Sequence, residues 1–183
     1  MLFVPNLQGS STVAGRFALA LALIATLGAA GCSNKPKVVV DPEIEEAVRV
    51  RKQNFSEMGT IAKNINDALK AGTKLVADPT VGSYVQQLGN YARDQKFWFK
   101  EGTGPASGAD THAKAEIWTQ QDDFAKKIEA LIESTGQLST TFTGGDEVAF
   151  ESQWKEVGKT CESCHDSYRT PDGRWLQSAA LEQ

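Results

Sequence analysis

The sequence predicts an all-α fold, an antiparallel four-helix bundle, on three observations. From Pro42 onward no stretch alternates apolar and polar residues as a half-buried strand does. Four stretches instead place apolar residues three and four positions apart, which is the period of an amphipathic helix. Three of the four keep this alternation along their length, as near-parallel helices in a left-handed bundle require.

The first two helices are predicted from capping signals and apolar stripes. Asp41 and Pro42 suit the start of the first helix, whose inward stripe then runs to Leu69 and contains one charged residue, Arg51. The second helix is predicted to start at Asp78-Pro79 and to end near Lys96. Its predicted inward residues are Val81, Val85, Leu88, Tyr91 and Phe97.

The second half of the chain predicts a long loop and two further helices. Residues 100–112 are rich in Gly, Ser and Pro, which favours a loop across one end of the bundle. The third helix should turn inward Ile117, Gln121, Phe124, Ile128, Leu131, Thr135 and Leu138. After a break at 144–146, the fourth should turn inward Phe150, Trp154, Val157, Cys161, Cys164 and Tyr168, and end before Pro171.

The first 31 residues are expected to be an export signal, because Arg16 precedes the apolar run 17–30 and small residues follow it. That run would reach only about 21 Å as a helix, short of the roughly 30 Å hydrocarbon core of a membrane. Cys32 follows Ala29-Ala30-Gly31, which resembles the bacterial lipobox and implies lipidation of Cys32; cleavage by the ordinary signal peptidase is the alternative. Residues 32–41 then form a tether, 42–170 the bundle and 171–183 a C-terminal tail.

The charge balance excludes nucleic acid as a partner. The chain has 19 basic and 23 acidic residues, a formal net charge of −4. Loss of residues 1–31 removes Arg16 and no acid, which leaves a formal charge of about −5. In such an exported chain Cys161 and Cys164 would form a disulfide unless another group binds them.

The segment Cys161-Glu162-Ser163-Cys164-His165 indicates what binds them. Two thiols at this spacing can add across the two vinyl groups of one haem, while the adjoining imidazole of His165 reaches the iron. The motif therefore predicts one covalent haem c near the C-terminal end of the last helix. A redox-active or structural disulfide, or half of a zinc site, are the alternatives; the first lacks a thioredoxin-like pattern and the second lacks ligands.

With these residues in view, the chain from 43 to 170 resembles the cytochromes c′, which are four-helix bundles. The segment Val157-Gly158-x-x-Cys161-x-x-Cys164-His165-x-x-Tyr168-Arg169 looks like the family's attachment segment. Glu116-Ile117-Trp118 with Phe124, the segment Phe99-x-x-Gly102-Thr103, and Arg51-x-x-x-Phe55-x-x-Met58 are similar to family segments around the haem. Lys52 departs from the pattern, since many members carry Gln at that position.

The resemblance implies roles for several residues. Phe55 would cover the iron on the side opposite His165 and leave it five-coordinate, whereas Met58 is the competing candidate for a sixth ligand. Arg51 would pair with a haem propionate, and Arg169 would screen the proximal side. Trp118 and Phe124 would pack against the porphyrin. Each also has a plain interpretation as bundle core or, for the two arginines, as a surface cation.

The expected function is haem-based ligand binding or electron transfer, with no catalytic residue. An apolar distal pocket favours NO and CO over O₂, so the leading hypothesis is NO binding in the bacterial periplasm by a lipid-anchored protein. A low-spin electron carrier that uses Met58 and meets redox partner proteins is one alternative. A haem-free helical lipoprotein with a Cys161–Cys164 disulfide is another. The resemblance also allows a homodimer built from the first two helices.

Overall fold

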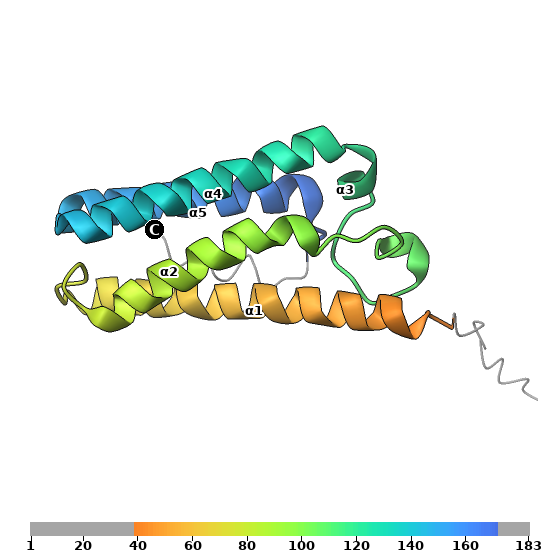
Figure 1. Ribbon diagram of the computed structural model, residues 1–183, viewed down its shortest axis with the longest axis horizontal. Helices are drawn as coiled ribbons and strands as arrows, with labels where there is room; N and C mark the ends of the chain where they lie inside the picture. The colour runs from red at the N-terminus through yellow and green to blue at the C-terminus, as the bar shows by residue number, and fades with distance from the viewer. Residues whose placement is uncertain (1–38, 172–183) are drawn as a thin grey trace, which may run out of the picture. The chain divides into compact units, whose positions relative to one another are not determined.

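Four long helices lie side by side and antiparallel in the computed structural model, which describes residues 39–171 (Figure 1). They are α1 (Pro42–Lys70), α2 (Pro79–Asp94), α4 (Gln121–Gly144) and α5 (Glu147–Tyr168). The predicted four-helix bundle is thereby confirmed. The predicted signal peptide, the lipidation site Cys32, most of the tether and the tail beyond Pro171 lie outside the described residues.

Aspartates set the starts of three helices. The Asp41 carboxylate accepts a hydrogen bond from the amide of Glu43 at 2.8 Å, and Asp78 accepts one from Thr80 at 2.7 Å. Asp146 does the same for α5, after Gly145 has ended α4 in a left-handed conformation at φ +74°. These bonds satisfy amides that have no partner within the helix, which is why the chain begins its helices at these residues.

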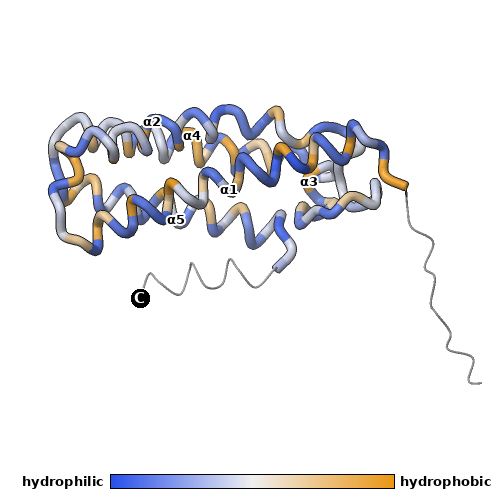
Figure 2. The backbone as a smooth tube through the Cα atoms, turned by 90° about the horizontal axis from the view of Figure 1, so that it is seen from below, coloured by the Kyte–Doolittle hydropathy of each residue, from blue (hydrophilic) through white to orange (hydrophobic). Residues whose placement is uncertain are grey.

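The core fills the space between the helices, and along the helices apolar residues recur between polar ones (Figure 2). The predicted stripes are buried over most of their length; their buried members include Val48, Met58, Ile65, Val81, Leu131, Leu138, Phe150 and Trp154. Among the residues that the structure describes, no helix combines the length and apolar character needed to cross a membrane.

Two predicted inward positions are wrong. Phe97 is 65% exposed, because α2 ends at Asp94 and the chain tightens into the 3₁₀ turn η1 (Gln95–Phe97), which changes the residue period. Gln121 is exposed because the third predicted helix is broken: α3 (Glu116–Thr119) ends at Gln120, whose φ of −120° and ψ of 46° interrupt the helix before α4 begins. The loop between η1 and α3 contains a second 3₁₀ turn, η2 (Pro105–Ser107).

One hydrogen bond ties the first helix to the last across the core. The indole Nε1 of Trp154 on α5 donates to Oδ1 of Asn66 on α1 at 2.7 Å, and Trp154 is 8% exposed. We expect Asn66→Ala to lower the free energy of unfolding by about 1–3 kcal/mol, since the indole N–H is left buried without its acceptor. Chemical denaturation of Asn66→Ala beside Asn64→Ala, in the same helix, measures this; equal losses in the two variants would contradict it.

Candidate haem site

The attachment motif lies near the end of α5, with its chemistry on one side of the helix. Residues three and four apart share a helix face, so Cys161, Cys164 and His165 point to the same side. All three are half-buried. Cys161 packs against the main core of the bundle, whereas Cys164 packs against a second cluster that contains Phe124 and Tyr168. The motif therefore lies between two apolar clusters. A group bound to both thiols would lie between the same two clusters.

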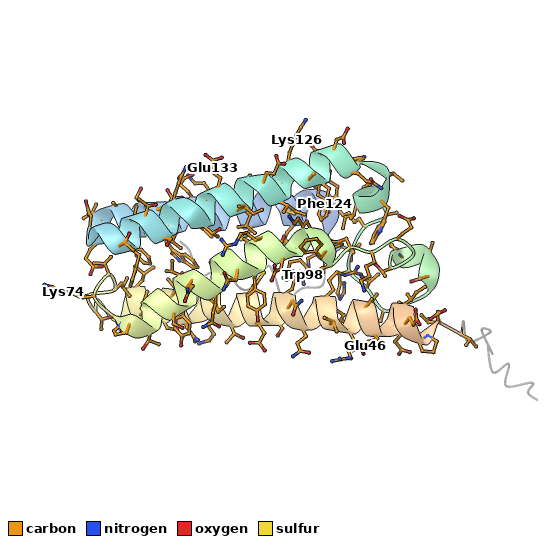
Figure 3. All side chains as sticks on the ribbon, in the orientation of Figure 1. Glu46, Lys74, Trp98, Phe124, Lys126 and Glu133 are labelled. Carbon is orange, nitrogen blue, oxygen red and sulfur yellow. The ribbon has the colours of Figure 1, made fainter. Side chains whose placement is uncertain are left out.

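Beside this motif the fold gathers an aromatic cluster from four separate segments of the chain: Phe55, Trp98, Phe99, Trp118, Phe124 and Tyr168. Phe99 is its centre, with ring centroids 4.8 Å from Phe124 and 6.1 Å from both Phe55 and Trp118. Trp98 and Phe124 lie at the same end of the bundle as the connection through α3 (Figure 3). Tyr168, 5.0 Å from Phe124, extends the cluster to the attachment helix.

Arg51 is buried among this cluster with only 3% of its surface exposed. Its guanidinium donates to the hydroxyls of Thr103 and Thr111 at 2.9 Å each, to the Thr103 carbonyl at 3.0 Å and to the Trp98 carbonyl at 3.4 Å. It also lies 4.9 Å from the centre of the Phe99 ring. These contacts orient the cation, but none of them is with an anion.

The lack of an anionic partner is the first test of whether haem fits. No acidic side chain among residues 39–171 forms an ion pair with Arg51, and its burial lowers the pKa of the guanidinium to about 10. A buried cation without a counter-charge is costly, so the site favours an anion such as a haem propionate. These surroundings are consistent with the predicted pairing of Arg51 with a haem propionate, which stays a prediction.

The cysteines provide the second test. Burial raises the pKa of the Cys164 thiol to about 11, so this thiol is protonated at neutral pH. No disulfide bond joins Cys161 to Cys164 in the structure. Within the described part of the chain no group of three or more His, Cys, Asp or Glu side chains could hold a metal ion. Two half-buried thiols and an adjoining imidazole on one face suit haem c.

The two candidate distal residues have different surroundings. Phe55 is half-buried, and its ring meets Trp98 edge-on at 5.1 Å within the aromatic cluster. Met58 lies in the main core at 8% exposure, and its Sδ accepts a hydrogen bond from Nε2 of the buried Gln95 at 3.5 Å. The sulfur that would have to bind iron is thus already engaged within the bundle core.

The remaining predicted residues lie close to the motif. Arg169 caps α5 through its amide, which donates to the His165 carbonyl at 2.9 Å, and it forms a β-bridge with Ala113. Trp118 is half-buried and donates its indole N–H to the Lys100 carbonyl at 3.1 Å. Lys52, the departure from the family pattern, forms an ion pair with Asp110 at 2.7 Å and so contacts the same loop as Arg51.

Three residues of the site had no signal in the sequence: Thr111, Lys114 and Asp123. Thr111 binds Arg51, and Lys114 binds the end of α5 through its amide and its ammonium group. Asp123 precedes the core residue Phe124 and reads as an ordinary exposed acid of a first helical turn. Only the tertiary fold brings these residues to the attachment helix.

Tyr168 and Asp123 join α5 to α4 beside the motif. The Tyr168 hydroxyl donates to the Asp123 carboxylate at 2.6 Å, and burial together with this bond raises the pKa of Tyr168 to about 12. Since this pKa lies above the unfolded value of about 10, the contact stabilises the fold below pH 10 and is lost as the pH rises through 12.

We expect an alkaline absorbance titration to show a late tyrosine step near pH 12, and Tyr168→Phe to remove that late step. Asp123→Asn should bring the step to lower pH, because the carboxylate that disfavours the phenolate is gone. A late step that persists in Tyr168→Phe would contradict the assignment.

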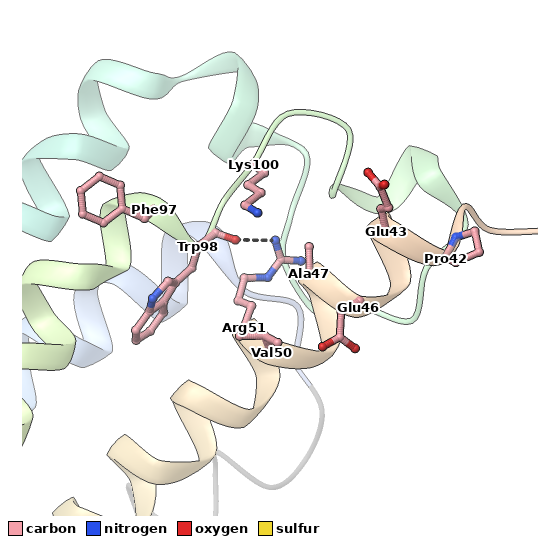
Figure 4. Close-up of a pocket in the computed structure, with 9 residues that line it drawn as sticks. All are labelled: Pro42, Glu43, Glu46, Ala47, Val50, Arg51, Phe97, Trp98 and Lys100. Carbon is pink, nitrogen blue, oxygen red and sulfur yellow. Dashed lines mark hydrogen bonds between the residues drawn. The ribbon is translucent and has the colours of Figure 1, made fainter.

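A pocket of about 500 Å³ lies apart from the motif, between the start of α1 and residues 97–100 (Figure 4). The exposed Phe97 and Val50 belong to its wall, and Arg51 bonds to the Trp98 carbonyl at its inner side. Neither cysteine of the motif nor His165 lines it. It is therefore a surface feature next to the Arg51 end of the site.

Comparison with known proteins agrees with this geometry. The model of the family described as Cytochrome C' matches residues 46–169. Cytochrome c' of Cereibacter sphaeroides is 30% identical over 152 residues, covering 80% of this chain and 95% of that protein. Cytochrome c' of Pararhodospirillum photometricum is 26% identical and covers 68% of this chain and 97% of its own. The chain spans only about half the length of two cytochrome c-554 relatives from Cereibacter sphaeroides, at 31% identity.

Solved structures give the same fold. A structure described as cytochrome c' aligns at 25% identity with a TM-score of 0.61, over 69% of this chain and 97% of its own. A nitric oxide complex of a cytochrome c prime mutant from Alcaligenes xylosoxidans aligns at 24% identity with a TM-score of 0.62, over 70% and 97%. Proteins of the matched family carry covalently bound haem c, for which the thiols and imidazole at the end of α5 are suited. The chain belongs to the cytochrome c′ family.

Proposed function

We propose that this protein is an exported haem c protein that binds nitric oxide at a five-coordinate iron. Cys161 and Cys164 would hold the haem through two thioether bonds, and His165 would be the single protein ligand of the iron. Arg51 would pair with a propionate, and Phe55 would cover the open side of the iron. When bound, the haem supplies an iron that can take a diatomic ligand; the chain's own residues decide which one.

The observation that carries this proposal is the difference between Phe55 and Met58. Phe55 belongs to the aromatic cluster that extends to the attachment helix, and its side chain has no atom that can bind iron. Met58 faces the main core, and Gln95 bonds to its sulfur. Binding of this thioether to iron would break that contact, which supports an open sixth position over a His/Met pair.

Ligand choice follows from the apolar character of the covering cluster. Bound O₂ carries partial negative charge and needs a hydrogen-bond donor, whereas NO and CO need much less polar support. Arg51, a buried donor one turn before Phe55 on α1, is already held by Thr103 and Thr111. The aromatic cover therefore favours NO and CO over O₂.

The proposal includes where the protein works. Export by the predicted signal in residues 1–31 would deliver the chain to the periplasm, where haem c attachment takes place, and acylation of Cys32 would anchor it to a membrane. The tether 32–41 would then hold the bundle away from the lipid surface. Mass spectrometry of the mature N-terminus distinguishes a lipid-bearing Cys32 from plain cleavage.

The test of function is a set of visible spectra of the purified protein made in a cell that matures c-type cytochromes. We expect the ferrous form to show one broad high-spin band, and we expect this band to shift when NO is added. Sharp, split low-spin bands in the ferrous protein would overturn the five-coordinate proposal in favour of electron transfer with a second axial ligand.

A further inference from the structure

His165 lies in the last turn of α5. The backbone carbonyls of this turn bond to a residue from a distant loop. The last four carbonyls of any α-helix have no partner within the helix. In α5 these belong to residues 165–168. Their partners decide how firmly this turn, and with it the imidazole, is held in place.

Lys114 bonds to three of these four carbonyls. Its Nζ donates to the carbonyl of Asp166 at 2.8 Å and to that of Ser167 at 3.1 Å. Its backbone amide donates to the Tyr168 carbonyl at 2.9 Å. The fourth carbonyl, that of His165 itself, accepts from the amide of Arg169 at 2.9 Å. One residue from the loop thus completes the end of the attachment helix.

The neighbouring residues of the loop fix the position of Lys114 through hydrogen bonds. The amide of Thr170 donates to the His112 carbonyl at 2.8 Å, and Ala113 forms the β-bridge with Arg169. The Ala113 amide in turn donates to the hydroxyl of Thr111, which accepts from Arg51. Lys114 is therefore anchored on its own side by a segment that is tied to α1.

The charge of Lys114 adds to the geometry. The C-terminal end of a helix carries partial negative charge on its exposed carbonyls, and a cation there is favourable. Lys114 as a residue is half-buried, and its ammonium group meets the carbonyls at an exposed end of the helix. Both the hydrogen bonds and the charge act at the last turn of α5, which begins at His165.

We propose that Lys114 is a positioning residue for His165: it holds the last turn of α5 so that the imidazole keeps one orientation toward the haem iron. This inference rests on the proposed role of His165 as the axial ligand. Lys114 lies outside the attachment motif and 51 positions before His165 in the chain.

The experiment uses the haem-loaded full chain with Lys114→Met, Lys114→Arg and a matched control, Lys127→Met. Lys127 also binds α5, through the Ser163 hydroxyl at 2.7 Å, so its loss removes a cation beside the same helix but none of the end carbonyl bonds. The resonance Raman band of the iron–imidazole bond is recorded in each ferrous protein, with amide hydrogen exchange at residues 166–169.

In Lys114→Met we expect the iron–imidazole band to move to lower frequency and broaden, and the amides of 166–169 to exchange about three- to tenfold faster. Lys114→Arg should restore most of the wild-type band, and Lys127→Met should leave it unchanged. An unchanged band in Lys114→Met, or an equal shift in Lys127→Met, overturns the inference while the ligation by His165 stands. If the wild-type protein itself shows no such band, the proposed ligation fails, and the inference with it.

Discussion

Replacing Phe55 by Met is expected to convert the haem from high-spin to low-spin. Phe55 is the residue of α1 that faces the aromatic cluster beside the attachment helix, and a thioether in its place can bind the open side of the iron. The ferrous spectrum should change from one broad band to sharp, split bands. The affinity for NO should fall, because the ligand must then displace the sulfur.

Two controls make this result specific. Phe55→Leu keeps an apolar side chain that cannot bind iron, so its spectrum should stay high-spin. Met58→Leu should also leave the spectrum unchanged and cost less than about 1.5 kcal/mol of stability, since the exchange preserves core volume. A high-spin Phe55→Met protein would show that Phe55 does not cover the iron. A low-spin wild type that Met58→Leu makes high-spin would show instead that Met58 is the ligand.

Removal of both thiols of the motif is expected to abolish covalent haem attachment. In the double variant Cys161→Ala, Cys164→Ala no thioether can form, so any haem should pass into the organic phase on extraction with acidified acetone. In the wild type the haem should remain with the protein. Each single variant should retain haem through the other thioether, with the absorption bands shifted because one vinyl group stays unreacted.

The matched control is Cys32→Ala, which lies outside the described residues and outside the motif. It should keep its haem covalently bound, because both thiols of the motif are still present. Haem that stays with the double variant would exclude Cys161 and Cys164 as attachment points. A colourless wild-type protein made with haem attachment available would favour the disulfide-bonded, haem-free alternative.

The fold was predictable because the sequence of each long helix contains the helical period of apolar residues, and some helices also begin with a capping residue. The apolar stripes at three and four residue spacing predicted all four long helices, and Asp41 and Asp78 marked two of their first residues correctly. The wrong positions, Phe97 and Gln121, lie where the chain leaves the α-helical period, at a 3₁₀ turn and at a break. A periodic pattern cannot detect such a change over two or three residues.

The attachment motif was predictable for a different reason: its chemistry is local. Two thiols and an imidazole within five residues determine what they can bind, whatever surrounds them. Arg51 also stood out, as the single charge on an apolar stripe, and its burial is confirmed at 3% exposure. Its bonds to Thr103 and Thr111, more than fifty residues away, could not be read from the sequence, because a loop without a period has no register.

By itself, therefore, the sequence determined the helices, the haem-binding chemistry of α5 and the presence of one buried cation. Only the tertiary structure decided that Phe55, Phe99, Phe124 and Tyr168 form one aromatic cluster, and that Lys114 closes the end of the helix that carries His165. The physical reason is the distance along the chain over which each effect acts. Helix period, capping and thiol spacing act within a few residues, whereas a buried cluster and a carbonyl cap depend on how distant segments pack.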